Sequence, residues 1–274
     1  MANPSPISYY GGKANMVNSI LPLIPKHQQY VEPFFGDGAV FFAKKPSPHE
    51  VINDTLDCAI TFYRVLKTRF PELQSMIQAT LHSESEYKRA KELLASEDDL
   101  LKAWAFWVQC NMSFSYGLSN GFAHSNAKKG RKNAGLQPIT SKNKRDNFKV
   151  NYSKRLERTE IFCRDALDII KLKDTPDTFF YIDPPYVSSD CGHYKGYTTE
   201  HFTELLDYLA TCKGKFLLSS YPEQILMEYR DKYGWNFQDK IDRVSVSGKD
   251  TKGKTKTECL TFNYELEIMQ QDLF

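Results

Sequence analysis

Long hydrophobic runs are missing from this 274-residue sequence, whose longest strictly apolar stretch is AWAFWV at residues 103–108. Such a stretch is far too short to span a membrane. Residues 1–10 contain no apolar segment typical of a secretory signal peptide. The six cysteines are scattered and form no C-x-x-C pair, so the sequence predicts neither a disulfide framework nor a zinc site. These absences lead us to expect a cytoplasmic protein.

A net charge of only +2 conceals an uneven distribution of charge along the chain. Residues 128–158 contain eleven lysine or arginine residues against two acids, so the remainder of the chain is acidic. A second basic stretch, SGKDTKGKTKTE, occupies residues 247–258. Charge runs are often solvated faces, but two basic segments on an otherwise acidic chain favour a polyanionic partner.

Short apolar segments alternate with helical patterns, which predicts a largely parallel sheet with helices on both faces. Strands are predicted at 30–35, 50–54, 160–165, 179–183 and 215–221, and helices at 56–70, 200–212 and 222–233. At the end of the sequence, 242–246 and 258–264 flank a basic loop without a helix, which predicts an antiparallel hairpin. Residues 71–156 interrupt the alternation with helical patterns at 84–95 and 98–112 and then a basic loop, and we interpret them as an inserted subdomain.

The segment FFYIDPPY, residues 179–186, ends an apolar strand with an acid, two prolines and a tyrosine. Neither proline has an N–H for a sheet hydrogen bond, and the first restricts Asp183 to an extended conformation. A carboxylate, a backbone carbonyl at Pro184 and the ring of Tyr186 are therefore expected at the carboxyl edge of the sheet, where open α/β sheets bind ligands. The alternative is that the prolines only stop a strand and Asp183 only caps the following turn.

A second motif, VEPFFGDGAVFF at residues 31–42, combines a strand, a glycine-containing turn and the start of a helix. Gly36 and Gly38 lack Cβ atoms, so the backbone there can approach a ligand closely. Asp54 follows the next strand and is placed to accept the hydroxyls of a ribose. Glu32 at the tip of the first strand is placed for an ammonium group or for neighbouring amides. Together these features predict an adenosine ligand with a cationic amino-acid end.

EPFFGDG, the strand-tip Asp54 and DPPY together resemble the Dam-like S-adenosylmethionine-dependent DNA adenine-N6 methyltransferases, with the alpha-type order of motifs. The resemblance covers nearly the whole chain and is weakest from 71 to 156. It implies a seven-stranded, mostly parallel Rossmann-like sheet and a catalytic domain of residues 1–70 and 157–274. Residues 71–156 would form the DNA target-recognition subdomain, and double-stranded DNA would be the substrate.

The resemblance also implies S-adenosylmethionine as cofactor, released as S-adenosylhomocysteine, and no metal. YYGGK at 9–13 and FCRD at 162–165 are similar to two further cofactor motifs of this family. The implied cofactor-binding residues are Tyr9, Lys13, Glu32, Pro33, Phe34, Phe35, Gly36, Gly38, Asp54, Asp165 and Asp183. The implied catalytic residues are Asp183, Pro184, Pro185 and Tyr186.

The chemistry expected of DPPY is activation of an exocyclic amine, whose lone pair is delocalised into the ring of the base. If the Asp183 carboxylate and the Pro184 carbonyl each accept one N–H, the lone pair of the nitrogen turns towards the methyl donor. Tyr186 would stack on an adenine flipped out of the duplex. Tyr194 and Tyr197 are either further covers for the base or cofactor or ordinary loop aromatics, and His193 is expected to be a loop residue.

DNA contacts are expected in the inserted region and in the hairpin loop, from polar side chains that meet base edges and from basic ones that neutralise phosphates. The candidates are Asn111, Ser113, Ser115, Asn120, Lys128, Lys129, Arg131, Lys132, Lys142, Lys144, Arg145, Lys249, Lys252, Lys254 and Lys256. The target sequence is not predicted.

Two partner proteins are hypotheses at this point. Gln270, Leu273 and Phe274 in QQDLF resemble the short peptides that dock into the bacterial sliding clamp, although so short a motif also fits an ordinary terminus. A cognate restriction endonuclease is the second.

For the activity, the alternatives are methylation of cytosine-N4 or of an RNA base, and a catalytically silent DNA-binding regulator. A dinucleotide-dependent oxidoreductase is disfavoured, because Phe41 stands where its glycine turn needs a small residue.

Overall fold

The computed structural model describes residues 5–118, 120–125, 136–187, 196–243 and 255–266. Its strands are β1 (Gln29–Glu32), β2 (His49–Asn53), β3 (Thr159–Phe162), β4 (Thr178–Ile182), β5 (Lys215–Ser220), β6 (Asn236–Arg243) and β7 (Thr255–Phe262). They form a seven-stranded sheet in the order β3-β2-β1-β4-β5-β7-β6. β4 pairs in parallel with β1 and with β5, whereas β7 is antiparallel to β5 and β6. The predicted Rossmann-like α/β fold with a terminal antiparallel hairpin is confirmed.

Helices occupy most of the remaining described chain. They are α1 (Val17–Ile20), η1 (Leu21–Leu23), α2 (Ala39–Ala43), α3 (Asp57–Thr68), α4 (Phe70–Ala79), α5 (Glu84–Leu93), α6 (Asp99–Met112), η2 (Phe114–Tyr116), α7 (Gln137–Asp146), α8 (Asn151–Arg155), α9 (Ala166–Lys173), α10 (Thr199–Leu209) and α11 (Gln224–Tyr233). The predictions of α3, α5, α6, α10 and α11 are confirmed, whereas α4, α7 and α8 were not expected. Within the described residues no helix is long and apolar enough to cross a membrane.

The chain forms two compact units. We call one the helical unit; it comprises Met1–Asn18, Phe35–Pro46 and Ile52–Asp165. The other, the sheet unit, comprises Ser19–Phe34, Ser47–Val51 and Ala166–Phe274. The expected boundary between a catalytic domain and a recognition subdomain is a functional division, and it stays a prediction.

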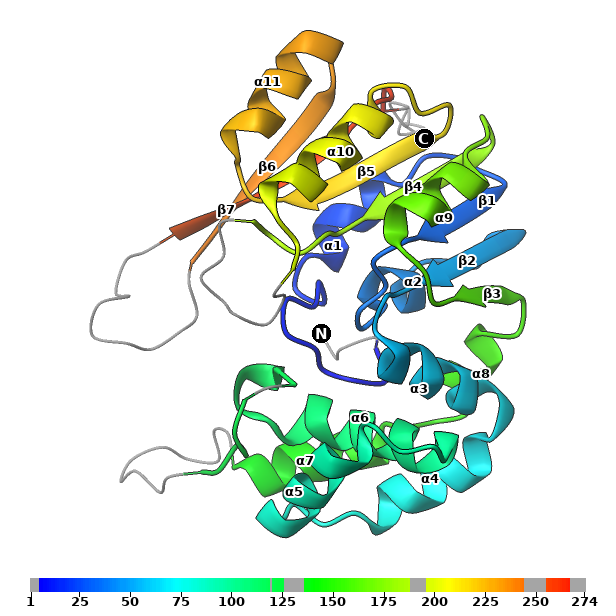
Figure 1. The fold of residues 1–274 in the computed structure, drawn as a ribbon, viewed down its shortest axis with the longest axis vertical. Helices are drawn as coiled ribbons and strands as arrows, with labels where there is room; N and C mark the ends of the chain where they lie inside the picture. The colour runs from blue at the N-terminus through cyan, green and yellow to red at the C-terminus, as the bar shows by residue number, and fades with distance from the viewer. Residues whose placement is uncertain (1–4, 119, 126–135, 188–195, 244–254, 267–274) are drawn as a thin grey trace, which may run out of the picture. The chain divides into compact units, whose positions relative to one another are not determined.

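Helix α6 is the centre of the helical unit, because every residue from 103 to 112 is buried, whichever side of the helix it lies on. Residues 103–108, AWAFWV, are all buried, and α3, α4, α5 and α7 each pack against α6 (Figure 1). Two polar groups on α6 have internal partners: Trp104 Nε1 donates to Thr80 Oγ1 at 2.8 Å and Gln109 Nε2 donates to the Tyr87 carbonyl at 2.8 Å. These bonds connect α6 with α4 and α5 and satisfy groups that burial removes from water.

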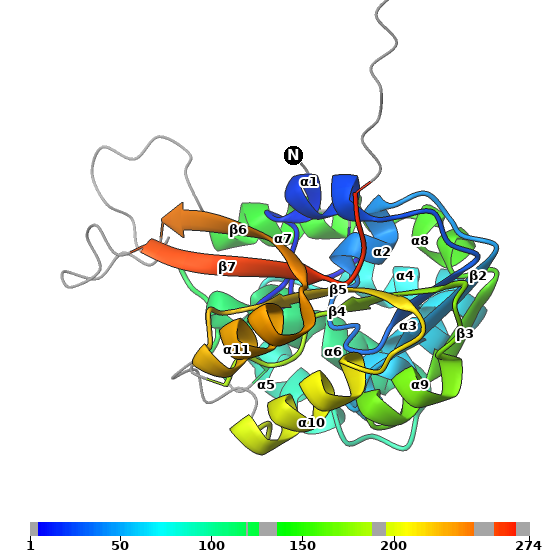
Figure 2. The same ribbon diagram turned by 90° about the horizontal axis from the view of Figure 1, so that it is seen from above.

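In the sheet unit, α9, α10 and α11 lie on one side of strands β4 and β5 (Figure 2). The side chains of Phe180 and Phe216 are level with each other in the parallel register and face these helices, since Phe216 packs against Trp235 at the end of α11. Alternation along the strands turns Tyr181 and Ser219 to the opposite face. That opposite face carries the polar residues of the candidate site.

The first strand of the hairpin was predicted at 242–246, but β6 begins at Asn236. Residues 242–243 do lie in β6, and 244–246 lie outside the described residues. The earlier start of the strand was missed because β6 is an edge strand with no apolar face to reveal it: its sequence is NFQDKIDR, and Phe237 and Ile241 are 58% and 70% exposed. Charged residues on an edge strand oppose pairing with other chains. Pro222, expected in the first turn of a helix, precedes the N-cap Glu223 of α11.

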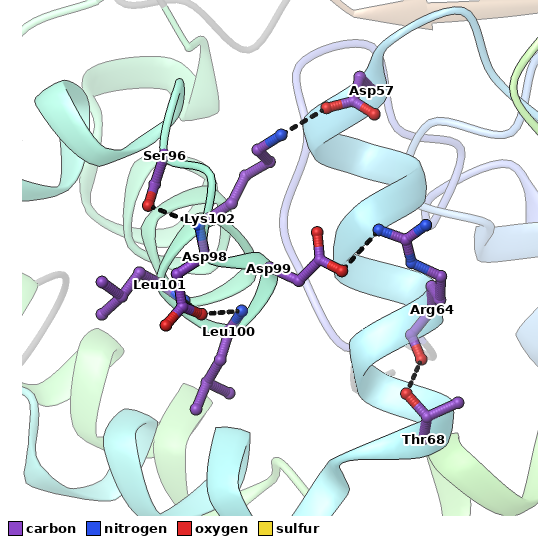
Figure 3. Close-up of polar contacts among 9 residues, drawn as sticks. All are labelled: Asp57, Arg64, Thr68, Ser96, Asp98, Asp99, Leu100, Leu101 and Lys102. Carbon is purple, nitrogen blue, oxygen red and sulfur yellow. Dashed lines mark hydrogen bonds and ion pairs between the residues drawn. The ribbon is translucent and has the colours of Figure 1, made fainter.

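The first turn of α6 is fixed by a capping residue and joined to α3 by ion pairs (Figure 3). Asp98 is the N-cap, and its Oδ1 accepts from the N–H groups of Leu100 and Leu101 at 2.8 and 3.2 Å. The next residue, Asp99, instead pairs with Arg64 of α3 at 2.8 Å on the surface. Asp98 therefore caps the helix, whereas the adjacent Asp99 forms an ion pair with the neighbouring helix.

We predict that Asp98→Ala lowers the free energy of unfolding by about 1 kcal/mol, because two N–H groups of α6 lose their acceptor. Asp99→Ala is the matched control, and it is expected to lose less, because exposed ion pairs are screened by water. Urea denaturation followed by circular dichroism measures both. Equal losses for the two variants would contradict the capping role.

Candidate active site

Strand β4 ends at Ile182, immediately before Asp183, as the two prolines require. All five residues of β4 are buried, Asp183 is half-buried and Pro184 is buried. The parallel register pairs Val31 of β1 with Phe180 of β4. Glu32 and Asp183 are therefore near the carboxyl ends of neighbouring strands.

A row of polar side chains crosses the sheet face opposite α10 and α11. Glu32, 2% exposed, accepts a hydrogen bond from the Tyr30 hydroxyl at 2.7 Å on the same strand. Burial raises the pKa of Tyr30 well above its ordinary value, and the nearby Glu32 charge raises it further. The pKa of Tyr181 is raised likewise, first by burial and then by the charges of Asp183, Glu32 and Glu258. These phenols stay protonated beside the carboxylates.

The hydroxyl of Tyr186 lies among the polar groups of three segments. It donates to Glu258 Oε1 of β7, lies 3.2 Å from Ser219 Oγ of β5 and 3.3 Å from Asp183 Oδ1. Burial, and then the charges of Asp183 and Glu258, raise the pKa of Tyr186 well above its ordinary value. Its ring lies 4.3 Å from that of Tyr221, centroid to centroid. Tyr186 is thus tethered at its hydroxyl.

In the helical unit, the turn after Phe35 requires its two glycines. Gly36 and Gly38 have φ values of +50° and +63°, in the left-handed region that side chains disfavour. A Cβ on Gly38 would lie 2.4 Å from the Phe35 ring, whereas one on Gly36 would lie 3.5 Å from the Tyr9 ring. Phe41, the large residue three positions after Gly38, is fully buried and packs edge-on against Phe35 at 5.5 Å.

Both backbone groups of Gly36 are held by side chains. Asp54 Oδ2 accepts from the Gly36 N–H at 2.9 Å and its Oδ1 accepts from the Leu56 N–H at 3.0 Å. The Tyr63 hydroxyl of α3 donates to the Gly36 carbonyl at 2.8 Å. Burial raises the pKa of Asp54, against the lowering effect of these amides. A carboxylate has about four lone-pair positions, so Asp54 can still accept ribose hydroxyls.

Asn53 joins the end of β2 to the segment that follows β3. Its Nδ2 donates to the Arg164 carbonyl at 3.0 Å, and its Oδ1 accepts from the Arg164 N–H at 2.9 Å. Its own carbonyl accepts from the Phe35 N–H at 2.9 Å. The exposed Asp165 is the next residue after Arg164, so Asn53 brings the predicted cofactor residues Asp165, Asp54 and Gly36 to one edge.

The YYGGK segment packs against the same glycine turn. A Cβ on Gly12 would lie 2.4 Å from Asp37 Oδ2, so a side chain there would displace the Asp37 carboxylate. Lys13 is buried, and its Nζ donates to the Gly11 carbonyl at 3.0 Å. In the sheet unit, Pro33 is buried, and the Phe34 ring lies edge-on to Tyr197 at 6.0 Å. The Tyr9 ring lies beside Gly36 of the glycine turn, and its predicted role in cofactor binding stays a prediction.

The predicted base-contacting segment forms a tight loop after α6. Asn111 and Ser113 are each 2% exposed, and Asn111 bonds to the backbones of Ser8 and Trp107. Asn120 Nδ2 donates to the Phe114 carbonyl at 2.7 Å. The Asn111 side chain therefore holds two backbone segments together inside the protein. Asn111 or Ser113 could contact a base only if its buried side chain became exposed.

Two features of the same loop were not foreseen from the sequence. Phe114 is 66% exposed, and the exposed Ser115 and Tyr116 have φ values of +53° and +60°. Such backbone strain in consecutive non-glycine residues often marks functional segments. The loop is held by a bridge between Ser113 and Phe122 and presents an aromatic ring to solvent.

The basic DNA-binding candidates fall into two groups. Lys142, Lys144 and Arg145 lie on α7; Lys142 pairs with Asp146, and Lys144 is half-buried with its pKa lowered by burial. Lys256 lies in β7. The other basic candidates lie outside the described residues: Lys128, Lys129, Arg131, Lys132, Lys249, Lys252 and Lys254. So do the loop residues His193 and Tyr194 and the clamp-binding candidates Gln270, Leu273 and Phe274.

The sequence analysis did not identify Tyr63, Ser219 and Glu258 as parts of this arrangement, nor the hydrogen bonds of Asn53 to the Arg164 backbone. Each is a polar residue within a buried segment of a helix or strand. A buried polar residue needs a partner, so for three of them its presence beside apolar residues was the available signal. Glu258 follows the polar residues TKT and offered no such signal. The sequence gives no clue to which partner it meets.

Comparison with known proteins identifies the relatives of this chain. The family model of the D12 class N6 adenine-specific DNA methyltransferases matches residues 9–254. The chain is 25% identical to the modification methylase StsI of Streptococcus sanguinis, over 95% of this chain and 43% of that protein. It is 27% identical to the type II methyltransferase M1.LlaDCHI of Lactococcus lactis subsp. cremoris, over 93% of both chains.

A further relative is the DNA adenine methylase of Escherichia coli K12, 25% identical over 72% of this chain and 70% of that protein. The chain thus spans less than half of one relative and nearly all of another. The family match covers both the glycine turn and the Asp183 segment. The chain belongs to the D12 class N6 adenine-specific DNA methyltransferases.

Proposed function

We propose that this protein is a site-specific DNA methyltransferase that transfers a methyl group from S-adenosylmethionine to the N6 amino group of an adenine flipped out of the duplex. The observation that carries the proposal is the end of β4, where a proline-fixed strand presents Asp183 beside a tethered Tyr186. Family membership favours adenine over cytosine-N4 or an RNA base. The intact DPPY segment speaks against a catalytically silent regulator.

Asp183 and Pro184 would each accept one N–H of the adenine amine. This withdraws the nitrogen lone pair from the ring and directs it out of the base plane, a matter of positioning and electrostatics. Pro185 restricts the backbone of Pro184 to an extended conformation, which keeps the accepting carbonyl in place. Tyr186 offers a ring face to the extruded base.

The helical unit contains groups that fit S-adenosylmethionine. Asp54 retains lone pairs for ribose hydroxyls, and the two glycines leave backbone without side chains beside it. The Tyr9 ring lies beside this turn. Asp165 follows Arg164, whose backbone is hydrogen-bonded to Asn53. Glu32, which the resemblance also assigns to the cofactor, lies in the sheet unit at the end of β1. When bound, the cofactor supplies the methyl group as an electrophilic sulfonium.

DNA binding would involve the loop after α6 and the basic residues of α7. Exposed Phe114 provides a surface for stacking on bases, and Lys142 and Arg145 carry charges suited to phosphates. Modification methylases among the relatives make a cognate restriction endonuclease a reasonable partner for this protein. The recognition sequence follows from none of these features.

We predict that Asp183→Ala abolishes methyl transfer to DNA while the affinity for S-adenosylmethionine largely survives. Asp54→Ala, by contrast, is expected to weaken cofactor binding by about tenfold or more, since ribose hydroxyls lose a charged acceptor. Transfer of a radiolabelled methyl group and calorimetric titration with the cofactor separate the two effects. Digestion of the product DNA to nucleosides tests for N6-methyladenine.

Retained transfer in Asp183→Ala would remove the catalytic assignment. Unchanged cofactor affinity in Asp54→Ala would instead contradict the cofactor site and leave the catalytic assignment standing. Methylcytosine in the digested product would replace the adenine proposal with its cytosine-N4 alternative.

We also propose that the peptide QQDLF at 270–274 docks into the bacterial sliding clamp. Its apolar Leu273 and Phe274 are separated by two residues from Gln270, as in the short peptides it resembles. Deleting these five residues is expected to abolish capture of the protein by immobilised clamp, with methyl transfer to short duplexes unchanged. Equal capture of the shortened and unshortened proteins would end this hypothesis.

A further inference from the structure

Four side chains of the sheet unit form what we call the phenol network: Asp183, Tyr186, Ser219 and Glu258. They come from the end of β4, the segment after it, β5 and β7. Ser219 is fully buried and Glu258 is 2% exposed. Ser219 Oγ donates to Glu258 Oε1 at 3.0 Å, and the Tyr186 hydroxyl donates to the same oxygen. One carboxylate oxygen thus accepts the protons of two hydroxyls.

The proton of Tyr186 has two carboxylates within reach. Asp183 Oδ1 lies 3.3 Å from the phenol oxygen, beyond the range of about 2.5–3.0 Å for ordinary O–H···O hydrogen bonds. A hydroxyl has one proton to donate. The geometry directs that proton to Glu258, so Tyr186 does not use the Asp183 oxygen nearest to it as its acceptor.

The raised pKa of Tyr186 keeps this proton on the phenol throughout the neutral range. The carboxylates of Asp183 and Glu258 and the hydroxyl of Ser219 face the Tyr186 hydroxyl. Removing Glu258 would therefore leave a protonated phenol beside Asp183. The Ser219 hydroxyl and the Asp183 carboxylate would both remain near the phenol. The phenol would then turn its proton to Asp183, because a charged carboxylate is the stronger acceptor.

We propose that Glu258 is a positioning residue for methyl transfer: by accepting the Tyr186 proton it prevents the phenol from competing with the substrate amine for Asp183. This inference rests on the proposed function, because it concerns the same Asp183. Glu258 also fixes the phenol oxygen and with it the plane of the Tyr186 ring. Glu258 touches neither base nor cofactor in this account; it acts through Tyr186.

The test compares steady-state methyl transfer by the unmodified protein, Glu258→Ala and the double variant Glu258→Ala with Tyr186→Phe. Glu258→Ala is expected to lower kcat by about tenfold or more, the scale for disturbing one preorganised hydrogen bond at a reacting group. Its affinity for S-adenosylmethionine by calorimetry should stay within about twofold. The double variant is expected to be faster than Glu258→Ala, because the competing proton is gone.

Glu258→Gln keeps an oxygen acceptor and is expected to retain more activity than Glu258→Ala. Glu258→Thr removes the acceptor with a residue better suited to a strand, and it replaces alanine in the comparison if the alanine variant does not fold. A simple packing defect at Glu258 would not be relieved by a second change at Tyr186, so the recovery separates positioning from structure.

A double variant no faster than Glu258→Ala would overturn the inference, as would an unchanged kcat in Glu258→Ala. Either result with normal transfer by the unmodified protein leaves the proposed function intact. Absence of transfer by the unmodified protein on any DNA duplex would overturn the proposed function itself, and this inference with it.

Discussion

The register of β4 against β1 and β5 is the constraint on which the candidate active site depends. It sets Phe180 level with Val31 and with Phe216, so Tyr181 and Asp183 share a face with Glu32 and Ser219. A slip of one residue would turn these polar side chains towards α10 and α11 and bring phenylalanines to the site. Two prolines with no N–H end the strand at the same place in every copy of the chain. Local sequence and strand pairing thus fix one geometry together.

Buried carboxylates on that face are tolerated because protonated phenols accompany them. Glu32 and Glu258 are each 2% exposed, and each accepts a hydrogen bond from a tyrosine. An isolated buried charge would be strongly unfavourable, whereas hydrogen bonds to the charged form offset part of its desolvation. Burial also raises the pKa values of Tyr30 and Tyr186, so neither donor loses its proton near neutral pH. The phenols and the acids stabilise each other.

The sequence predicted those parts of the molecule that local chemistry determines. Strand β4 was recognisable because an apolar run meets two prolines, and the glycine turn because Gly36 and Gly38 need backbone freedom. Helix α7 escaped prediction because its sequence QPITSKNKRD has a weak apolar face. The start of the edge strand β6 was not predicted for a similar reason, because its sequence NFQDKIDR has no apolar face.

Parts of the site that depend on long-range partners could not be predicted in this way. Glu258 and Tyr186 are 72 residues apart, and Ser219 and Glu258 are 39 apart. No pattern in the neighbourhood of Glu258 indicates that β7 will lie beside β5, because the hairpin fixes only its pairing with β6. Tyr63 was correctly placed on a helix, yet its hydroxyl bond to Gly36 follows only from the packing of α3 under the turn. Hydrogen-bond partners are settled by tertiary structure.

The loop after α6 has two features that the stability of the fold does not require, namely positive φ values and an exposed phenylalanine. Two consecutive non-glycine residues, Ser115 and Tyr116, adopt positive φ values, and Phe114 stays 66% exposed. Each strained residue costs on the order of 1 kcal/mol, and exposing a phenylalanine forgoes the gain of burying it. The Phe114 N–H donates to the Gly121 carbonyl, and Asn120 Nδ2 donates to the Phe114 carbonyl; these two bonds hold the loop in this form. A stable domain has no need of such a loop, whereas the DNA binding proposed above would use one, because exposed apolar side chains can insert between stacked bases.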